Sequence, residues 1–106
     1  MINSMDVVEL KKLIDTNENL LLVDCREQDE WDAGHIKEAK FVPLSRFQEL
    51  FESELPSKDA KIIMQCRSGK RSMNACMFLM EQGYEDLTNL EGGILAWQEN
   101  GFEIVK

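Results

Sequence analysis

The sequence has little of what several classes of protein require. It contains one histidine, two prolines and three cysteines among 106 residues. The cysteines, Cys25, Cys66 and Cys76, are odd in number and spaced 41 and 10 residues apart, which fits neither a disulfide framework nor a zinc site. No apolar run approaches the ~20 residues of a membrane helix. We therefore expect free thiols, no bound metal and no membrane partner.

The N-terminal residues and the distribution of charge restrict the expected location and partners of the protein. The first ten residues lack a basic segment followed by an apolar one, so we expect a cytoplasmic protein without a secretory signal. A net charge of −8 disfavours a nucleic-acid partner, whose phosphates would be repelled. Three of the twelve basic residues, Arg67, Lys70 and Arg71, nevertheless fall within five positions. This local cluster of cations on an acidic protein indicates a site for an anion.

Strand-like and helix-like segments alternate along the chain, whose length suits a single domain, residues 1–106. Expected strands are 20–24 (LLLVD), 40–44 (KFVPL), 61–65 (KIIMQ) and 86–90 (DLTNL), and 102–105 (FEIV) is expected to be a terminal extended segment. Expected helices run from a Ser4 cap to about Thr16, from a Ser45 cap to about Glu52, over 71–82 and over 92–100. This order predicts an α/β fold with a mostly parallel sheet of about five strands and helices on both faces.

The segment CRSGKRS, residues 66–72, joins the KIIMQ strand to the helix that follows. A short turn of this kind points successive backbone N–H groups into one concavity, and the helix N-terminus adds partial positive charge. The segment also supplies a flexible glycine, two hydroxyl donors and three cations: Gly69; Ser68 and Ser72; and Arg67, Lys70 and Arg71. These groups favour a thiolate, so we predict a pKa for Cys66 well below the ~8.5 of a free cysteine.

Three motifs resemble those of the single-domain rhodaneses, or thiosulfate sulfurtransferases. CRSGKRS resembles their active-site loop, and LEGGILAWQENGFEI (90–104) resembles their closing Gly-Gly-x-x-x-Trp helix and terminal strand. The segment 23–44 resembles a further signature of the family, carried here by Asp24, Arg26, Glu30, Trp31, Gly34, His35, Ile36, Ala39 and Pro43. The sequence departs from the family at Lys37 and Glu38, where a Pro-Gly pair is common, and at Cys25, where valine is usual.

The resemblance implies a rhodanese-like three-layer fold and a ping-pong sulfur transfer that needs neither a metal nor an organic cofactor. Cys66 would attack the outer sulfur of thiosulfate, release sulfite and become a persulfide. The sulfur would then pass to cyanide or to a thiol, either a small thiol or that of a thioredoxin-like protein. The backbone donors of residues 67–72 would hold the persulfide, and the basic side chains would receive the anionic donor.

Two other functions stay open on the sequence alone. A persulfide carrier or a redox-sensing regulatory module would have the same loop, and in a redox sensor Cys25 would form a disulfide with Cys66. A cysteine phosphatase or arsenate reductase is less favoured. In those enzymes an arginine lies six residues after the cysteine, where this chain has Ser72 and places Arg71 one step earlier.

The remaining polar and aromatic residues are interpreted as structural. We expect His35 to have no catalytic role, Asp24 to support the loop or pair with Arg26, and Cys76 to be an inert core residue. Trp31 and Trp97 are interpreted as packing aromatics. The acidic segment before Gly34 is interpreted as a solvated turn or a short helix, with a docking surface for a basic partner as the less favoured alternative; its acidic members are Glu27, Asp29, Glu30 and Asp32.

Overall fold

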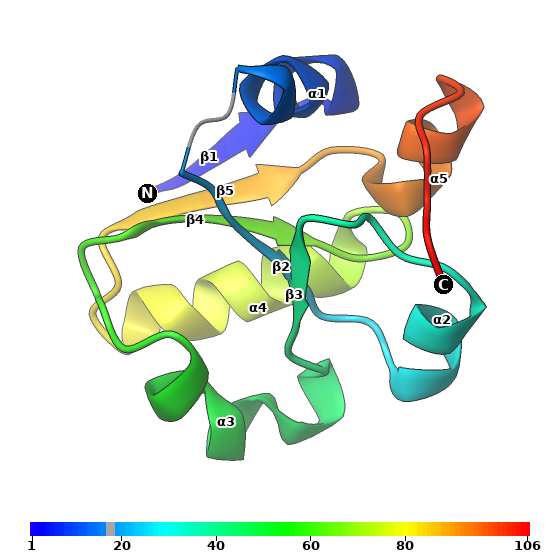
Figure 1. Cartoon of the computed structure of the whole chain (residues 1–106). Coiled ribbons are helices and arrows are strands. Elements are labelled where there is room, and N and C mark those ends of the chain that lie inside the picture. Colours follow the sequence, from blue (N-terminus) through cyan, green and yellow to red (C-terminus); the bar gives the residue numbers. More distant parts are fainter. Residues whose placement is uncertain (17–18) are drawn as a thin grey trace.

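The computed structural model describes residues 1–16 and 19–106 and shows a five-stranded parallel sheet between two layers of helices (Figure 1). The strands are β1 (Ile2–Met5), β2 (Leu21–Asp24), β3 (Ala39–Phe41), β4 (Lys61–Gln65) and β5 (Asp86–Leu90), in the order β1-β5-β4-β2-β3. The helices are α1 (Val7–Asp15), α2 (Gln28–Ala33), the 3-10 helix η1 (Leu44–Arg46), α3 (Phe47–Glu54), α4 (Lys70–Glu81) and α5 (Gly93–Glu99). The predicted α/β class and parallel sheet are confirmed.

The sheet is buried on both faces, which explains why its central strands are almost continuously apolar. Alternate residues of β2 and β4 enter opposite cores, so Val23 and Met64 face one layer of helices while Leu22 and Ile63 face the other. Helices α3 and α4 cover the first face, and α1 and α5 cover the second (Figure 1). In the described part of the chain, every helix is too short or too polar to span a bilayer.

The N-terminus differs from the sequence prediction. Ser4 does not cap a helix but lies in strand β1, which pairs with β5 and places Ser4 opposite Asn89. Helix α1 begins later, and its cap is Asp6, whose carboxylate accepts a hydrogen bond of 2.9 Å from the backbone N–H of Glu9. The strand was missed because an edge strand buried on one side carries few apolar residues, and its partner lies more than eighty residues away.

Two further expectations are corrected. Ser45 does not cap α3; it lies in η1, and α3 begins at Phe47 after Arg46. The terminal strand that the resemblance implied for residues 102–105 does not belong to the sheet; this segment makes only an isolated antiparallel bridge, Val105 to His35. The fifth strand of the sheet is therefore β1 rather than the chain's last segment.

Parallel strands bring their carboxyl ends to one edge of the sheet, and in an α/β fold that edge is where ligands bind. Strand β2 ends at Asp24, β4 ends at Gln65 directly before Cys66, and β5 ends at Leu90, one residue before the Gly92–Gly93 pair. The register pairs Asp24 with Gln65. The three segments that carry the predicted motifs therefore meet at this edge.

Candidate active site

The loop after β4 is held in a tight curl around the sulfur of Cys66. Gly69 adopts the left-handed conformation (φ 111°), which lets α4 begin at Lys70, four residues after the cysteine. The backbone N–H of Gly69 then turns back and donates to the Cys66 sulfur at 3.1 Å. The hydroxyl of Ser72, in the first turn of α4, lies 3.3 Å from the same sulfur.

These contacts explain the acidity of the thiol. Cys66 is only 1% exposed, and burial by itself raises the pKa of its thiol. The ionised sulfur can accept hydrogen bonds from the backbone N–H groups of Ser72, Gly69 and Ser68, and from the Ser72 hydroxyl when that hydroxyl turns to it, and these bonds outweigh the cost of burial. The pKa of Cys66 is therefore lowered from its ordinary value, in the direction expected from the sequence.

The N-terminus of α5 anchors the outer side of the loop. The backbone N–H of Ile94 donates to the carbonyl of Cys66 at 3.0 Å, and that of Leu95 donates to the carbonyl of Arg67 at 3.1 Å. The approach is so close that a Cβ on Gly93 would lie 2.4 Å from the Arg67 carbonyl oxygen and 2.5 Å from that of Cys66. Sequence reasoning recognised the Gly-Gly pair as a motif but assigned it no contact with the loop.

The three cations of the loop do not act together. The side chains of Arg67 and Lys70 are exposed, and among the described residues neither forms an ion pair. Arg71 instead turns to Glu30 of α2 and makes two parallel bonds of 2.7 and 2.8 Å to its carboxylate. We expected Glu30 to lie in a solvated turn, and that expectation is wrong. The Arg71 guanidinium lowers the pKa of the Glu30 carboxyl to about 2.

Asp24 and Arg26 form a buried ion pair where β2 ends, on the strand next to β4. The carboxylate of Asp24 accepts from the Arg26 side chain at 2.8 and 3.0 Å, and both residues are almost completely buried. Arg26 also donates to the carbonyl of Gly34 at 2.8 Å. The pairing that we expected from the sequence is confirmed. It fixes the chain on both sides of α2, the helix that carries Glu30.

His35 is held by contacts with Trp31 and Val105. Its ring stacks on Trp31 with centroids 3.6 Å apart, and its Nδ1 lies 3.0 Å from the carbonyl oxygen of Trp31. Its backbone exchanges two hydrogen bonds of 2.8 Å with Val105. These contacts explain His35 as a residue that fastens the C-terminal segment, in agreement with the structural role that we assigned it.

The other two thiols are buried. Cys25 follows β2 as Cys66 follows β4, so the two cysteines continue neighbouring strands in register on the face that packs against α4. Burial, with the nearby sulfur of Cys66 as a smaller cause, strongly raises the pKa of Cys25. Burial likewise raises the pKa of Cys76 to about 12. Both remain neutral thiols at neutral pH and are therefore poor nucleophiles.

We expect Cys25→Val to retain sulfur transfer within about twofold of the unaltered chain, because a neutral buried thiol contributes little as a nucleophile. The measurement is thiocyanate formation from thiosulfate and cyanide, with thermal unfolding as the check on folding. A loss of tenfold or more in a folded Cys25→Val protein would assign Cys25 a part in the reaction.

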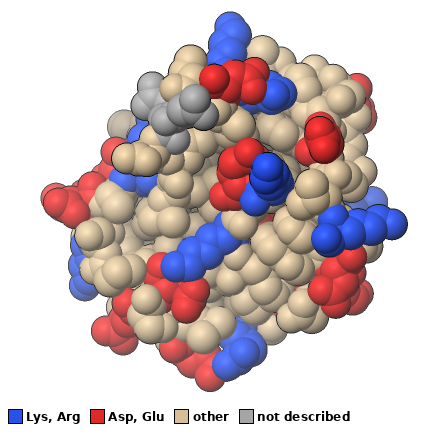
Figure 2. All heavy atoms as spheres, in the orientation of Figure 1, with Lys and Arg blue, Asp and Glu red and all other residues tan. Residues whose placement is uncertain are grey.

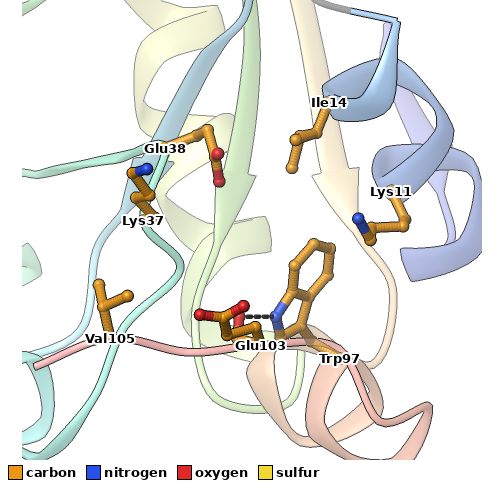
Figure 3. A pocket seen from close by; sticks show the side chains of 7 residues that line it. All are labelled: Lys11, Ile14, Lys37, Glu38, Trp97, Glu103 and Val105. Atoms are coloured by element: carbon orange, nitrogen blue, oxygen red, sulfur yellow. Dashed lines mark hydrogen bonds between the residues drawn. The ribbon is translucent and has the colours of Figure 1, made fainter.

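A hollow lies on the face of the sheet that α1 and α5 cover, between these two helices and the segment before β3 (Figure 3). None of the seven described residues that line it carries a thiol or hydroxyl, and it mixes lysines with glutamates. The indole N–H of Trp97 points along its wall and donates to the backbone carbonyl of Glu103 at 2.8 Å (Figure 3). This hollow offers no thiol that could carry a sulfur, so we place the chemistry at Cys66.

Figure 2 shows acidic and basic side chains interspersed on the face turned to the viewer, without a continuous basic field. The described residues hold no group of three or more His, Cys, Asp or Glu side chains that could bind a metal ion. The exposed pair Arg67 and Lys70, beside a buried ionisable sulfur, remains the feature best suited to a small anion.

Comparison with known proteins agrees with this geometry. The family model for the rhodanese-like domain matches residues 6–100. A protein of Allochromatium vinosum named "Sulfurtransferase" is 41% identical over 105 residues, which cover 99% of this chain and 96% of the relative. "Thiosulfate sulfurtransferase 18" of Arabidopsis thaliana is 36% identical, covering 95% and 82%. The crystal structure of a rhodanese-like domain protein from Staphylococcus aureus superposes with a TM-score of 0.82 at 29% identity, covering 98% and 99%.

Proposed function

Because this chain belongs to the rhodanese-like domain family, we propose that it is a sulfurtransferase that takes a sulfane sulfur from thiosulfate and carries it as a persulfide on Cys66. The observation that supports this most strongly is the Cys66 sulfur itself, which lies at the carboxyl end of β4 and accepts a backbone hydrogen bond from Gly69. A sulfur held in this way is a nucleophile whose anionic forms are stabilised by fixed dipoles.

The transfer proceeds in two steps that balance without a cofactor. The Cys66 thiolate attacks the outer sulfur of thiosulfate, a new S–S bond forms, and the bond to the sulfonate sulfur breaks, so that sulfite leaves with the electron pair. The outer sulfur of the resulting persulfide carries the negative charge. A nucleophile, cyanide or a thiolate, then attacks that outer sulfur, and the Cys66 thiolate leaves. One transfer between two solutes thus becomes two transfers at a fixed sulfur.

The loop's own groups have separate roles in these steps. The backbone N–H groups that stabilise the Cys66 thiolate also lie where they stabilise the persulfide, because the charge moves by only one S–S bond length. Arg67 and Lys70 attract the thiosulfate dianion at the rim of the loop. Arg71, bound to Glu30, positions α2 against α4 and contributes little charge to the substrate.

Thiosulfate is the donor that the charges favour. A small dianion gains more from two exposed cations than a monoanionic donor does. The relative named "Thiosulfate sulfurtransferase 18" agrees with this choice. For the acceptor we propose a thiol, from a small molecule or a thioredoxin-like protein, and for the location the reducing cytoplasm, which suits three free cysteines.

A kinetic comparison of two assays tests the proposal. We expect formation of thiocyanate from thiosulfate and cyanide to be saturable, and p-nitrophenyl phosphate to be hydrolysed no faster than in the absence of protein. Phosphatase activity is disfavoured because the loop arginine already binds a carboxylate. Hydrolysis of the phosphate ester at a rate comparable to sulfur transfer would contradict the proposed function. A persulfide carrier would instead accept sulfur from thiosulfate and turn over slowly with cyanide.

Lys70→Ala should raise the KM for thiosulfate by about three- to tenfold and change kcat by less than about twofold, because an exposed cation chiefly helps to bind the anion. Lys61→Ala is the matched control. It removes the same charge from an exposed lysine at the far end of β4 and should leave KM unchanged. A selective fall in kcat for Lys70→Ala would assign Lys70 to the chemical step instead.

A further inference from the structure

Asn89 belongs to none of the motifs described above, yet its side chain lies against the sulfur loop. It is the penultimate residue of β5 and is only 2% exposed. Its Nδ2 donates to the backbone carbonyl of Gly69 at 3.1 Å, and its Oδ1 accepts from the Ser72 hydroxyl at 2.5 Å. Asn89 therefore joins the two residues that themselves contact the Cys66 sulfur.

The directions of these hydrogen bonds follow from their chemistry. A backbone carbonyl only accepts, so the amide group that faces Gly69 must be the NH2 of Asn89. The amide oxygen consequently faces Ser72, and it too can only accept. The single hydroxyl proton of Ser72 is then committed to Asn89. In the 3.3 Å contact between Ser72 Oγ and Cys66 Sγ, the neutral thiol is the donor.

We propose that Asn89 is a positioning residue that competes with the Cys66 sulfur for the hydroxyl proton of Ser72 and so limits formation of the free thiolate. When Cys66 ionises, the Ser72 hydroxyl can donate a hydrogen bond to the thiolate only if its O–H turns away from Asn89. The two oxygens of Ser72 and Asn89 then face each other at 2.5 Å without a proton between them. Two buried acceptors in that position are unfavourable.

The arrangement acts differently on the loaded enzyme, a point that rests on the proposed function. In the persulfide the negative charge lies on the outer sulfur, and Cys66 Sγ no longer needs a donor. Ser72 then keeps its bond to Asn89, while the backbone N–H groups of the loop face the anion. The network therefore favours the sulfur-loaded form over the free thiolate and holds the sulfur until an acceptor arrives.

The other ionisable groups around the sulfur are either paired or neutral, so the Ser72 hydroxyl is the group whose hydrogen bond to the thiolate can change. Those near it are Cys25 after β2 and Arg71 and Cys76 on α4, and the Asp24–Arg26 pair lies at the end of the neighbouring strand β2. Arg71 is bound to Glu30, Asp24 is bound to Arg26, and burial keeps both other thiols neutral. Among the described residues, Ser72 supplies the hydroxyl hydrogen-bonded to the sulfur. The direction of its O–H bond depends on Asn89, which accepts its proton.

The test is the pKa of Cys66, followed through the ultraviolet absorbance of the thiolate in the chain without any sulfur substrate. The raised pKa values of Cys25 and Cys76 and the lowered pKa of Cys66 make Cys66 the first of the three cysteines to ionise as the pH rises. We expect Asn89→Leu to lower the pKa of Cys66 by about half a unit to one unit, because Ser72 is then released to the sulfur. In a Ser72→Ala background the same change should have no such effect. Thr88→Val, a neighbouring buried polar residue on β5, is the control and should leave the pKa unchanged.

An unchanged or raised pKa in Asn89→Leu would overturn the proposal, as would an equal fall in the absence of Ser72. Loss of the bond to Gly69 loosens the loop and acts in the opposite direction, so a fall is not explained by it. If Asn89→Leu does not fold, the pKa of Cys66 in Ser72→Ala tests the proposal by itself. The proposal predicts a rise of less than about half a unit, whereas a rise of one unit or more would show that Ser72 donates freely to the thiolate. The titration involves no transfer of sulfur, so its outcome is independent of whether the proposed function holds.

Discussion

Replacement of Cys66 by serine should reduce sulfur transfer by at least about a thousandfold while leaving the fold intact, because the hydroxyl is neither ionised at neutral pH nor able to carry a sulfane sulfur. The substitution is nearly isosteric, and Gly69 and Ser72 remain hydrogen-bond partners for the new oxygen. We therefore expect the free energy of unfolding to change by less than about 1 kcal/mol. Thiocyanate formation and thermal unfolding measure the two effects.

Cys76→Ser is the matched control for that experiment. It makes the same change at a buried thiol of α4, the helix that follows the loop, where the sulfur faces the backbone of Thr88 rather than the loop. Activity should stay within about threefold of the unaltered chain, since Cys76 has no part in the transfer. Retention of transfer in Cys66→Ser would remove Cys66 from the mechanism.

The second large effect is expected at Gly93, where the loop and α5 touch through their backbones. Gly93→Ala would place a methyl group against the carbonyls of Cys66 and Arg67, at a residue whose φ of 55° already strains an L side chain. We expect a loss of about 2–4 kcal/mol in the free energy of unfolding. Because the carbonyls must retreat, the amides that face the sulfur move with them. Transfer by the folded fraction should fall by about tenfold or more.

Gly101→Ala separates the two causes of that loss. Gly101 also has a positive φ, 75°, but nothing lies within 4 Å of an added Cβ. It should cost only about 1 kcal/mol, the penalty of the backbone conformation itself, and leave transfer unchanged. Equal destabilisation by the two alanines would mean that the close approach of α5 to the loop has no energetic weight. Denaturant unfolding measures the change in stability, and thiocyanate formation measures the change in sulfur transfer.

The sulfur loop was predicted from the sequence because everything that defines it is local. An apolar strand, a cysteine, a glycine and the start of a helix follow each other within a dozen residues, so Cys66 and Gly69 could be placed without tertiary information. The central strands β2 and β4 were predicted for the same reason, since strands buried on both faces are almost continuously apolar. The alternation of strands and helices indicated a mostly parallel sheet but not the order of its strands.

What was missed depends on contacts between distant residues. Strand β1 exists because β5 offers it an edge, and its own four residues carry too weak a pattern to indicate a strand. The bond between Glu30 and Arg71 joins residues 41 positions apart, and that between Ser72 and Asn89 joins residues 17 apart. No local pattern shows that one loop cation is neutralised, or that an amide holds a hydroxyl proton. These long-range pairs distinguish the site from a generic basic loop.

The central claim is that the Cys66 sulfur carries a second sulfur, and the intact mass of the protein after incubation with thiosulfate tests it most directly. The account predicts a gain of one sulfur atom per chain, which disappears when cyanide is added and does not form in Cys66→Ser. A mass that stays unchanged in thiosulfate, or an added sulfur that persists in Cys66→Ser, would contradict it.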